Sequence, residues 1–336
     1  MNRRKFLATA TAVTGTALLP SWAHTAYAQS TGTYTYLTPF TLSLAFAPIL
    51  YASAAGLYEK QNLNVKVEVG RGAGQVIQLV AAKQVQSGRT GGANYMAMRA
   101  MDNADVIAFA TVAQTSPFVV ISSSKAPLTQ VKELEGKTVG MASFGGSMEA
   151  TLNLMLAKAG IDLKSVQRER VADGPASFAM IEAGRLHAFF GNTSTISRLK
   201  AQNYPLASMP VDDGVPGQVY VAREADLKEN RDQHIAFIRG ARQAITAMAG
   251  MNDAQLTDAI KLMGKKFDVP GIDKLDIALN DLKGNRDLWL VHGVENALKN
   301  DPKQWAEGQQ LLQQAELMRP TTRALYTNDI WEASLV

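Results

Sequence analysis

The feature of this sequence that most narrows its possible folds is a repeated unit of an apolar strand, a polar turn and a helix. In the first part of the chain, residues 34–37, 64–69 and 106–114 have the apolar or alternating pattern of strands. Residues 44–58 and 76–83 have the pattern of helices, and turns that contain glycine or proline separate the two kinds of element. This alternation predicts an α/β fold in which a parallel sheet carries helices on both faces.

The same unit appears again further along the chain. Residues 118–124 and 138–142 have strand character, and residues 147–160 form an amphipathic helical pattern closed by a glycine. From residue 234 the pattern changes, and residues 234–317 are mostly helical, with one of the expected helices at residues 287–300. The sequence therefore predicts two doubly wound lobes and a helical C-terminal tail that packs on the first lobe.

The N-terminal 28 residues have the composition of an export signal. Arg3 and Arg4 stand at its start, an uncharged apolar run follows at residues 6–19, and Ala26 and Ala28 have the spacing that a signal peptidase requires. The apolar run is too short to span a bilayer. The paired arginines favour the twin-arginine route, and an ordinary secretory signal is the alternative. We therefore expect cleavage after Ala28 and a mature protein in the periplasm.

Net charge and cysteine content exclude several classes of protein. The full chain carries a formal charge of +4, and the three positive residues of the export signal account for most of it. The nearly neutral mature protein gives no reason to expect a nucleic-acid partner. The sequence contains no cysteine, which excludes disulfides, thiolate catalysis and cysteine-ligated metals. We expect neither a cofactor nor a metal.

The turns that follow the predicted strands, one of them at residues 90–94, share one chemistry. Ligands of open parallel sheets bind beyond the carboxyl ends of the strands, where these turns lie. Gly, Ser, Thr, Asn and Gln dominate the turns, and Arg71 and Asp173 are their charged residues. They contain no histidine and no pair of carboxylates of the kind that catalysis uses. We therefore predict a pocket that binds a small solute without transforming it; the alternative is that the turns serve chain reversal alone.

One of these turns, in the stretch MASFGGSMEA at residues 141–150, has the features of a site for a negative group. The backbone N–H groups of Gly145, Gly146 and Ser147 are expected at a helix N-terminus, where such groups bind anions. Glycine at this turn also has a purely geometric explanation. Phe144 either stacks on a planar ligand or belongs to the core.

Four stretches of the mature chain resemble one family, in the order that the family has them. Two of them, FAPILYASAAGLYEKQNLNVKVE and LTQVKELEGKTVGMASFGGSMEATLNLMLAKAGID, resemble its first helix–strand unit and a later strand–helix unit. The others, YVAREADLKENRDQHIAFIRGARQA and LYTNDIW, resemble its returning strand with the following helix and its terminal motif. Together they are similar to the periplasmic solute-binding proteins of ABC importers of the nitrate, sulfonate and taurine group, and to THI5-like domains.

This resemblance implies a type II periplasmic-binding fold, in which two lobes are joined by a two-segment hinge near residues 115–118 and 209–217. Lobe one would comprise residues 29–115 and 213–336, and lobe two residues 116–212. The ligand would lie between the lobes and be enclosed as they close. By position in the family, the ligand-binding residues would be Thr38, Thr41, Gly74, Gln75, Asn94, Tyr95, Ser116, Ser143, Gly146, Ser147, Asn192 and Thr193.

The resemblance also implies a function. It indicates a monomeric binding protein, not an enzyme, that delivers a small organic solute to a membrane permease; the solute would be a sulfonate, a carboxylate or a heteroaromatic compound. Phe40, Tyr95 and Phe144 would supply apolar packing. THI5-type enzymes carry a cysteine-rich motif that this chain lacks. Two alternatives remain open, namely an enzyme on the same fold with Asp173 or Tyr95 as its base, and a sensor that signals to a membrane receptor.

Overall fold

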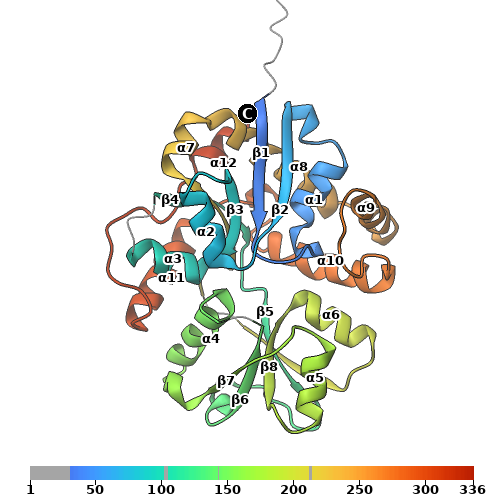
Figure 1. The fold of residues 1–336 in the computed structure, drawn as a ribbon, viewed down its shortest axis with the longest axis vertical. Helices are drawn as coiled ribbons and strands as arrows, with labels where there is room; N and C mark the ends of the chain where they lie inside the picture. Colours follow the sequence, from blue (N-terminus) through green and yellow to red (C-terminus); the bar gives the residue numbers. More distant parts are fainter. Residues whose placement is uncertain (1–30, 102–104, 143, 212–213) are drawn as a thin grey trace, which may run out of the picture.

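The computed structural model describes residues 31–336, apart from residues 102–104, 143 and 212–213. The predicted export signal therefore lies outside the described residues. The described chain forms two lobes, each built on its own five-stranded sheet (Figure 1). Within this part of the chain, no helix combines the length and the apolar character that crossing a membrane requires.

The first lobe, the upper one in Figure 1, is built on a sheet of five strands. These strands are β1 (Thr31–Thr38), β2 (Leu63–Val69), β3 (Ser87–Gly91), β4 (Val106–Ala113) and β10 (Gln218–Arg223). Their order across the sheet is β2-β1-β3-β10-β4. β1 pairs in parallel with β2 and β3, whereas β10 runs antiparallel to both of its neighbours.

The second lobe has a sheet of the same size. Its strands are β5 (Phe118–Ser123), β6 (Thr138–Met141), β7 (Gln167–Arg170), β8 (Ala188–Asn192) and β9 (Leu206–Pro210). They lie in the order β7-β6-β8-β5-β9. β6 pairs in parallel with β7 and β8, and β5 runs antiparallel to β8 and β9.

Each sheet thus contains one antiparallel strand, where the sequence pattern alone predicts parallel sheets. The chain enters β5 directly after leaving β4 of the first lobe, and it enters β10 after leaving β9 of the second lobe. A strand that begins at the junction of the lobes runs away from it, whereas the parallel strands run toward it and end there. The carboxyl ends of the parallel strands in both sheets therefore face one another across the junction.

Helices flank both sheets (Figure 1). Those that follow the strands of the two sheets are α1 (Ala47–Ala54), α2 (Ala73–Ala81), α3 (Gly92–Met101), α4 (Ser147–Lys158), α5 (Pro175–Glu182) and α6 (Thr193–Ala201). The C-terminal part adds α7 (Glu224–Glu229), α8 (Arg231–Ala249), α9 (Asp253–Lys266), α10 (Leu275–Trp289), α11 (Pro302–Gln314) and α12 (Asp329–Ala333). Short 3-10 turns are η1 (Leu44–Phe46), η2 (Glu59–Gln61), η3 (Val131–Leu134), η4 (Leu163–Ser165) and η5 (Val294–Asn296).

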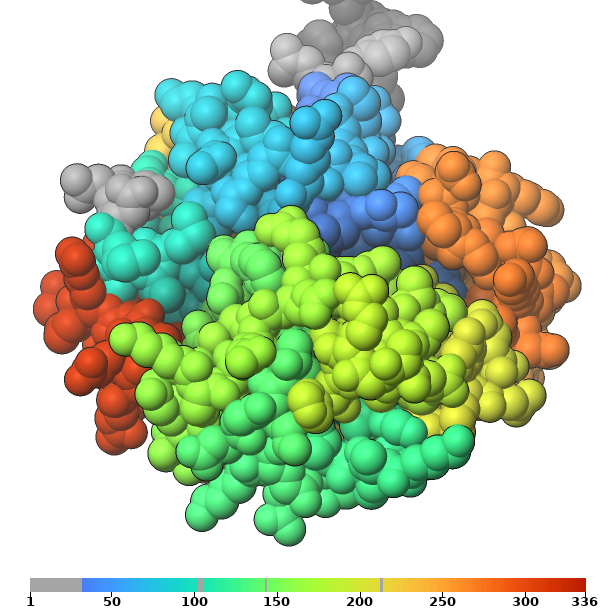
Figure 2. Space-filling model, turned by 60° about the horizontal axis from the view of Figure 1, so that its bottom comes forward, coloured from blue at the N-terminus to red at the C-terminus, as the bar shows by residue number. Residues whose placement is uncertain are grey.

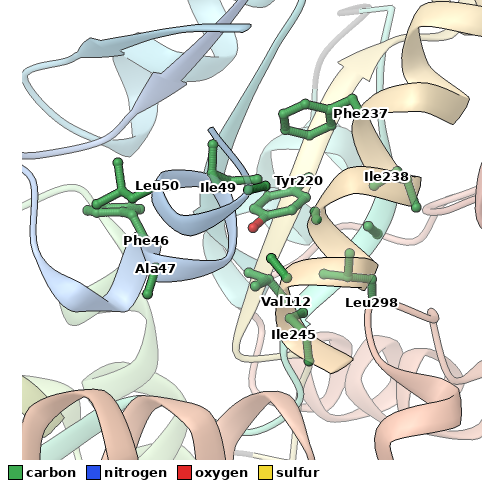
Figure 3. Close-up of a cluster of buried hydrophobic side chains, with 14 of the residues drawn as sticks. Phe46, Ala47, Ile49, Leu50, Val112, Tyr220, Phe237, Ile238, Ile245 and Leu298 are labelled. Atoms are coloured by element: carbon green, nitrogen blue, oxygen red, sulfur yellow. The ribbon is translucent and has the colours of Figure 1, made fainter. Parts of the chain in front are cut away.

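The C-terminal helices pack on the first lobe, as the sequence predicts, and an aromatic cluster fixes α8 there. The Phe237 ring of α8 stacks on Tyr34 and Tyr58, with ring centroids 4.6 and 5.7 Å apart. Figure 3 shows Tyr220 of β10 lying between the residues of α1 and those of α8. Such aromatic contacts add to the large apolar area that the rings bury. One tail helix, α10, also lies against α6 of the second lobe, so the tail reaches the junction.

Two local predictions are wrong. Residues 90–94 do not form a turn, because β3 ends at Gly91 and α3 begins at Gly92. The sequence of this strand, SGRTG, contains no large apolar residue, and yet all five residues are buried because the strand lies between β1 and β10. Residues 287–300 do not form a helix of their own, since α10 continues to Trp289 and Gly293, with a φ of +82°, turns the chain into η5.

Candidate ligand-binding site

A cavity of about 490 Å³ lies between the two lobes, at the carboxyl ends of the parallel strands. Figure 2 shows the second lobe, green to yellow, seated against the blue and orange parts of the first lobe. The cavity has the size of a small-molecule site. The larger side chains of its apolar lining are those of Phe40, Leu42, Leu44, Phe46, Phe118, Met148, Val269, Ile272 and Ile277.

Arg89, in the middle of β3, lies in the wall of this cavity and is only 4% exposed. Its Nη1 donates to the carbonyl oxygen of Ala45 at 2.5 Å, and its Nε donates to Oε1 of Gln218 at 3.2 Å. The centre of the guanidinium lies 4.9 Å from the centroid of the Phe46 ring. Burial lowers the pKa of the Arg89 guanidinium, because poorly solvated surroundings disfavour its charge. The side chain is therefore held in place by neutral groups.

Arg89 differs from a second buried arginine, Arg99, because it has no described carboxylate as a counter-ion. Arg89 and Arg99 are the buried arginines of the described residues. Arg99 forms an ion pair with Glu224, whereas no carboxylate of the described chain lies within 4 Å of the Arg89 guanidinium. A buried charge without a counter-ion is unfavourable, and an anion placed in the cavity would remove that cost. The cavity thus favours a ligand with an anionic group.

Asp281 of α10 lies in the wall of the same cavity and is 9% exposed. Its Oδ1 accepts hydrogen bonds from Oγ of Ser194 at 2.6 Å and from Nδ2 of Asn285 at 2.8 Å. Burial raises the pKa of this carboxyl to about 6, although both hydrogen bonds and the positive charge of Arg198 act in the opposite direction. Asp281 is therefore mostly ionised at neutral pH.

The other acidic side chain of the cavity, Asp173, already has partners within the second lobe. Its carboxylate accepts hydrogen bonds from Nδ2 of Asn192 at 3.0 Å and from the hydroxyl of Thr195, and Nη2 of Arg198 lies 3.8 Å away. Asn192 also caps α6, because its Oδ1 accepts the backbone N–H of Thr195 at 3.1 Å. Asp173 and Asn192 thus stabilise the start of α6.

Hydrogen bonds join the two lobes on both sides of the cavity. On one side, the backbone N–H of Gly91 donates to Oγ of Ser147, the first residue of α4, at 3.0 Å. On the other side, Ser194 of α6 donates to Asp281 of α10, and the Thr193 hydroxyl lies 3.3 Å from an amide oxygen of α10. The lobes are therefore in contact around the cavity, in a closed arrangement.

Four of the residues that the resemblance implies as ligand contacts line the cavity, namely Thr41, Ser147, Asn192 and Thr193. Phe40, which we expected to supply apolar packing, lines it as well. Ser147 and Thr193 take part in the hydrogen bonds between the lobes, and the Asn192 side chain is committed to the α6 cap. Within this group, Thr41 has its hydroxyl in an exposed loop, where it is accessible to a ligand.

The other described residues of that set lie outside the cavity lining. Tyr95 is buried in the first lobe, where its hydroxyl donates to the carbonyl of Leu325 at 2.7 Å and accepts the backbone N–H of Ala108 at 2.9 Å. The Thr38 hydroxyl donates to the carbonyl of Phe40 at 2.7 Å. Ser143 lies outside the described residues. The remaining residues of the set that do not line the cavity are Gly74, Gln75, Asn94, Ser116 and Gly146.

Local contacts explain why several of these residues do not line the cavity. Oε1 of Gln75 accepts the backbone N–H of Arg71 at 2.6 Å and so fastens the loop before α2. Asn94 belongs to α3, because β3 runs directly into that helix. Oγ of Ser116 accepts the backbone N–H of Phe118 at 3.3 Å, within the crossing between the lobes. Gln75 and Ser116 therefore stabilise the backbone beside them.

The turn at residues 141–150 also differs from the expectation. The backbone N–H of Gly145 donates to Oε2 of Glu149 at 2.6 Å, so α4 satisfies this donor with its own side chain. Phe144 is 40% exposed and lies outside the cavity lining, with the Arg170 guanidinium 5.0 Å from the centre of its ring. Of the three predicted donors, the backbone N–H of Gly145 is thus bonded within the protein, and Ser147 is the residue that lines the cavity. Potential metal ligands do not gather in groups of three or more anywhere in the described chain.

The family model described as NMT1/THI5 like matches residues 43–254, more than half of the chain. The chain belongs to the NMT1/THI5-like family. A relative named "Putative binding protein YtlA", from Bacillus subtilis (strain 168), is 23% identical over 261 residues, which cover 76% of this chain and 77% of the relative. The residues that match the family model include Arg89, whereas α10 with Asp281 lies beyond them.

Solved structures share the fold of this NMT1/THI5-like protein. The alkanesulfonate-binding protein SsuA from Xanthomonas axonopodis pv. citri, solved bound to MOPS, is similar with a TM-score of 0.63 at 16% identity, over 87% of this chain and 96% of its own. The desulfurization enzyme DSZB is similar with a TM-score of 0.57 at 10% identity, over 90% of this chain and 98% of its own. This NMT1/THI5-like protein therefore has the periplasmic-binding-protein fold that the family resemblance implies.

The two buried charged residues of the cavity, Arg89 and Asp281, are not among the ligand-binding residues that the sequence analysis predicts. Arg89 lies in a strand of small residues, and Asp281 lies in the tail that was expected only to cover the first lobe. A signal for Arg89 exists in the sequence, because it is a single charged residue within a run of small residues, SGRTGGA, between two helices. We find no comparable signal for Asp281, which is one of several acidic residues in the helical tail.

Proposed function

We propose that this protein is the solute-binding component of an ABC importer, and that it captures a small organic anion between its lobes and delivers it to a membrane permease. The observation that carries this proposal is Arg89, a buried guanidinium in the wall of the cavity that no carboxylate neutralises. An anionic group of the ligand would accept charge-assisted hydrogen bonds from Arg89. Nη2 of Arg89 is available for them, because it donates to no described group of the protein.

The rest of the lining supports an organic ligand over a bare inorganic anion. Phe46 lies beside Arg89, and Phe118 begins β5 directly after the crossing between the lobes. A molecule with a sulfonate or carboxylate head and an apolar body would satisfy both the charge and the apolar wall. The Xanthomonas SsuA protein was solved with MOPS, which is an organic sulfonate. Closure of the lobes would exclude water and strengthen the ion pair.

Binding has more support in the cavity than catalysis. The carboxylate of Asp173 is occupied by Asn192, Thr195 and Arg198, and burial raises the pKa of Tyr95, whose hydroxyl is bonded inside the first lobe. DSZB is an enzyme of the same fold, but a fold by itself does not carry an activity. A sensor would use the same cavity, so the permease is proposed from the similarity to importer-type binding proteins.

We also propose that the protein works as a monomer in the periplasm. Residues 1–28 would serve as a cleaved export signal, with Arg3 and Arg4 directing the twin-arginine route and cleavage after Ala28. N-terminal sequencing of the exported protein reads this cleavage directly.

Native mass spectrometry and a matched pair of variants test the proposed function. We expect protein purified from its own host to retain an organic anion. For that compound, the dissociation constant of Arg89→Met should be about 10- to 100-fold higher than that of the unchanged protein, because a charge-assisted contact is lost. Arg71→Met removes an exposed arginine outside the cavity and should bind normally. A neutral ligand, or equal affinity in the folded Arg89→Met variant, would contradict the proposal.

A further inference from the structure

Resting on the proposed function, we further propose that α4 is the pivot on which the second lobe opens and closes. Leu154 of α4 stays packed on the first lobe, and the lobes part between α6 and α10. The cavity then opens on one side, and the solute enters between these two helices. The two contacts that join the lobes differ in chemistry, and this difference favours a one-sided opening.

One face of α4 is buried against the first lobe, where α4 lies against α3 and α11 (Figure 1). Leu154 is 0% exposed and belongs to an apolar cluster that contains Trp305 and Leu312 of α11. Ala150, one turn earlier on the same face of α4, packs against this cluster as well. Moving this face away from α3 and α11 would expose apolar side chains to water, which is unfavourable.

Another face of α4 belongs to the core of its own lobe. Leu152 and Met155 pack there in a cluster of second-lobe residues. A rotation of the second lobe therefore carries α4 with it, and α4 turns on its Leu154 face. Ser147, about two turns from Leu154 along the helix, meets Gly91 at the cavity. A rotation about Leu154 separates Ser147 from Gly91 while Leu154 stays buried.

The segment that returns from β9 to β10 passes beside this face of α4. A β-carbon added at Gly214 would lie 2.9 Å from Cδ1 of Leu311 in α11 and 3.4 Å from Nζ of Lys158 in α4. Val215, the next residue of the segment, belongs to the same apolar cluster as Leu154. Backbone that joins the lobes thus lies next to the Leu154 contact. Points near an axis of rotation move least, so this is where a pivot would lie.

The contact between α6 and α10 is of a different kind. Ser194 of α6 donates to Asp281 of α10. The larger apolar residues of α6, Ile196 and Leu199, pack in the core of the second lobe instead. Polar groups that separate can form hydrogen bonds with water, whereas an exposed Leu154 cannot. The lobes therefore part more readily at α6 and α10 than at α4.

Distances between paired spin labels measure this motion. The sequence contains no cysteine, so introduced cysteines carry the labels alone. Lys200→Cys in α6 and Asp276→Cys in α10 form the pair on the side that opens. Lys164→Cys, in the turn beside α4, and Gln310→Cys in α11 form the pair at the pivot. All four of the replaced residues are exposed.

Each labelled protein is measured as purified, with the compound that it retains, and again after unfolding in guanidinium chloride, dialysis and refolding. In the emptied protein we expect a long, broad distance distribution between α6 and α10, and a narrow one at the pivot. The retained compound should shorten the first distance and leave the second unchanged. Equal changes in the two pairs, or a broad distribution at the pivot in the emptied protein, would overturn the inference.

Two leucines of α4 give a matched comparison. Leu154→Ala should broaden the distance distribution at the pivot in the emptied protein, because the contact with the first lobe is weakened. Leu152→Ala removes an equally buried side chain that packs in the second lobe, and it should leave this distribution narrow. Leu154→Met keeps the apolar volume and should behave like the unchanged protein. If Leu154→Ala folds and keeps the narrow distribution, Leu154 is not the pivot.

The outcomes separate this inference from the proposed function, which is tested by the affinity of Arg89→Met. If the retained compound changes neither distance and Arg89→Met binds it weakly, anion capture stands and the pivot is rejected. If the purified protein retains no compound, the proposed function is contradicted. The two distributions of the empty protein then still support or reject the pivot.

Discussion

The chemistry of the cavity depends on Arg89 and Asp281, whose charges are buried without a counter-ion among the described residues. Arg89 donates to a carbonyl and an amide oxygen, and Asp281 accepts from a hydroxyl and an amide. Each residue loses water on closure and gains only neutral partners, so the protein alone does not recover the cost of burial. An anionic group on the ligand would recover this cost at Arg89 in the closed state, and so would link binding to closure.

The burial of Asp281 leads to a prediction about stability and pH. Its pKa is about 6 in the folded protein, against an ordinary value of 3.8. Between these values the unfolded chain has lost the proton and the folded protein still holds it, so the folded state loses stability as the pH rises. Relative to Asp281→Asn, the free energy of unfolding of the unchanged protein should fall by up to about 3 kcal/mol from pH 4 to pH 7.

Denaturant titrations of both proteins, each saturated with the retained organic anion that holds the lobes closed, measure this difference at each pH. Taking the difference between them removes the contributions of the other titrating groups, which the two proteins share. A difference that stays constant over this range would mean that Asp281 is solvated even when the lobes are closed. That result would contradict the closed geometry around α10.

From the sequence, only the cavity residues that lie in the turns at strand ends could be predicted. Thr41, Ser147, Asn192 and Thr193 could be placed at strand ends because the strand–helix pattern locates those turns. Arg89 could not be placed in this way. Its strand is buried because it pairs with strands on both sides, and it has no large apolar residues that would mark it as a strand in the sequence. Tyr95 was misplaced because no pattern shows which side of a helix faces the core, and its hydroxyl is bonded there.

At the scale of elements, the close approach of β3 and α4 controls closure. A β-carbon added at Gly91 would lie 2.2 Å from Oγ and 2.4 Å from Cβ of Ser147, and Ser147 supplies all of its nearest neighbours. The added β-carbon would therefore clash with the second lobe and not with its own lobe. We predict that Gly91→Ala weakens ligand binding by about 10-fold or more, because overpacking of this size costs about 1–3 kcal/mol. The thermal stability of the unliganded protein should change little, since the lobes can part.

Two further variants make this test specific. Combining Gly91→Ala with Ser147→Gly removes the atoms in conflict and should restore part of the affinity. Gly74→Ala is the control, because the added β-carbon has open space around it on α2, outside the cavity. Isothermal titration with the ligand retained from the host measures all of them. Normal affinity in Gly91→Ala would show that the lobes do not approach in this way during binding.

The elements themselves were largely predictable where their apolar pattern is strong. The expected strand at residues 106–114 corresponds to β4, and the expected helix at residues 147–160 corresponds to α4. β3 was missed because tertiary pairing, not local pattern, makes SGRTG a strand. Strands were expected at the positions of β5 and β10, but their antiparallel direction was not foreseen, because it depends on where the chain crosses between the lobes.

At the scale of the whole molecule, the C-terminal tail has a second role beyond covering the first lobe. The aromatic contacts of Phe237 fix α8 on the sheet of that lobe, and α10 continues from this base to the junction, where it faces α6. The cavity is therefore bounded by three parts of the chain, namely the first lobe, the second lobe and α10. We expect the second lobe to move relative to the other two when a ligand binds, which would make closure part of recognition.

The most direct test of the central claim is a crystal structure of the protein with the ligand that it retains from its host. We predict a ligand enclosed between the lobes, with an anionic group at hydrogen-bond distance from the Arg89 guanidinium. A ligand bound elsewhere, or one whose position in the cavity leaves Arg89 without an anionic partner, would contradict it.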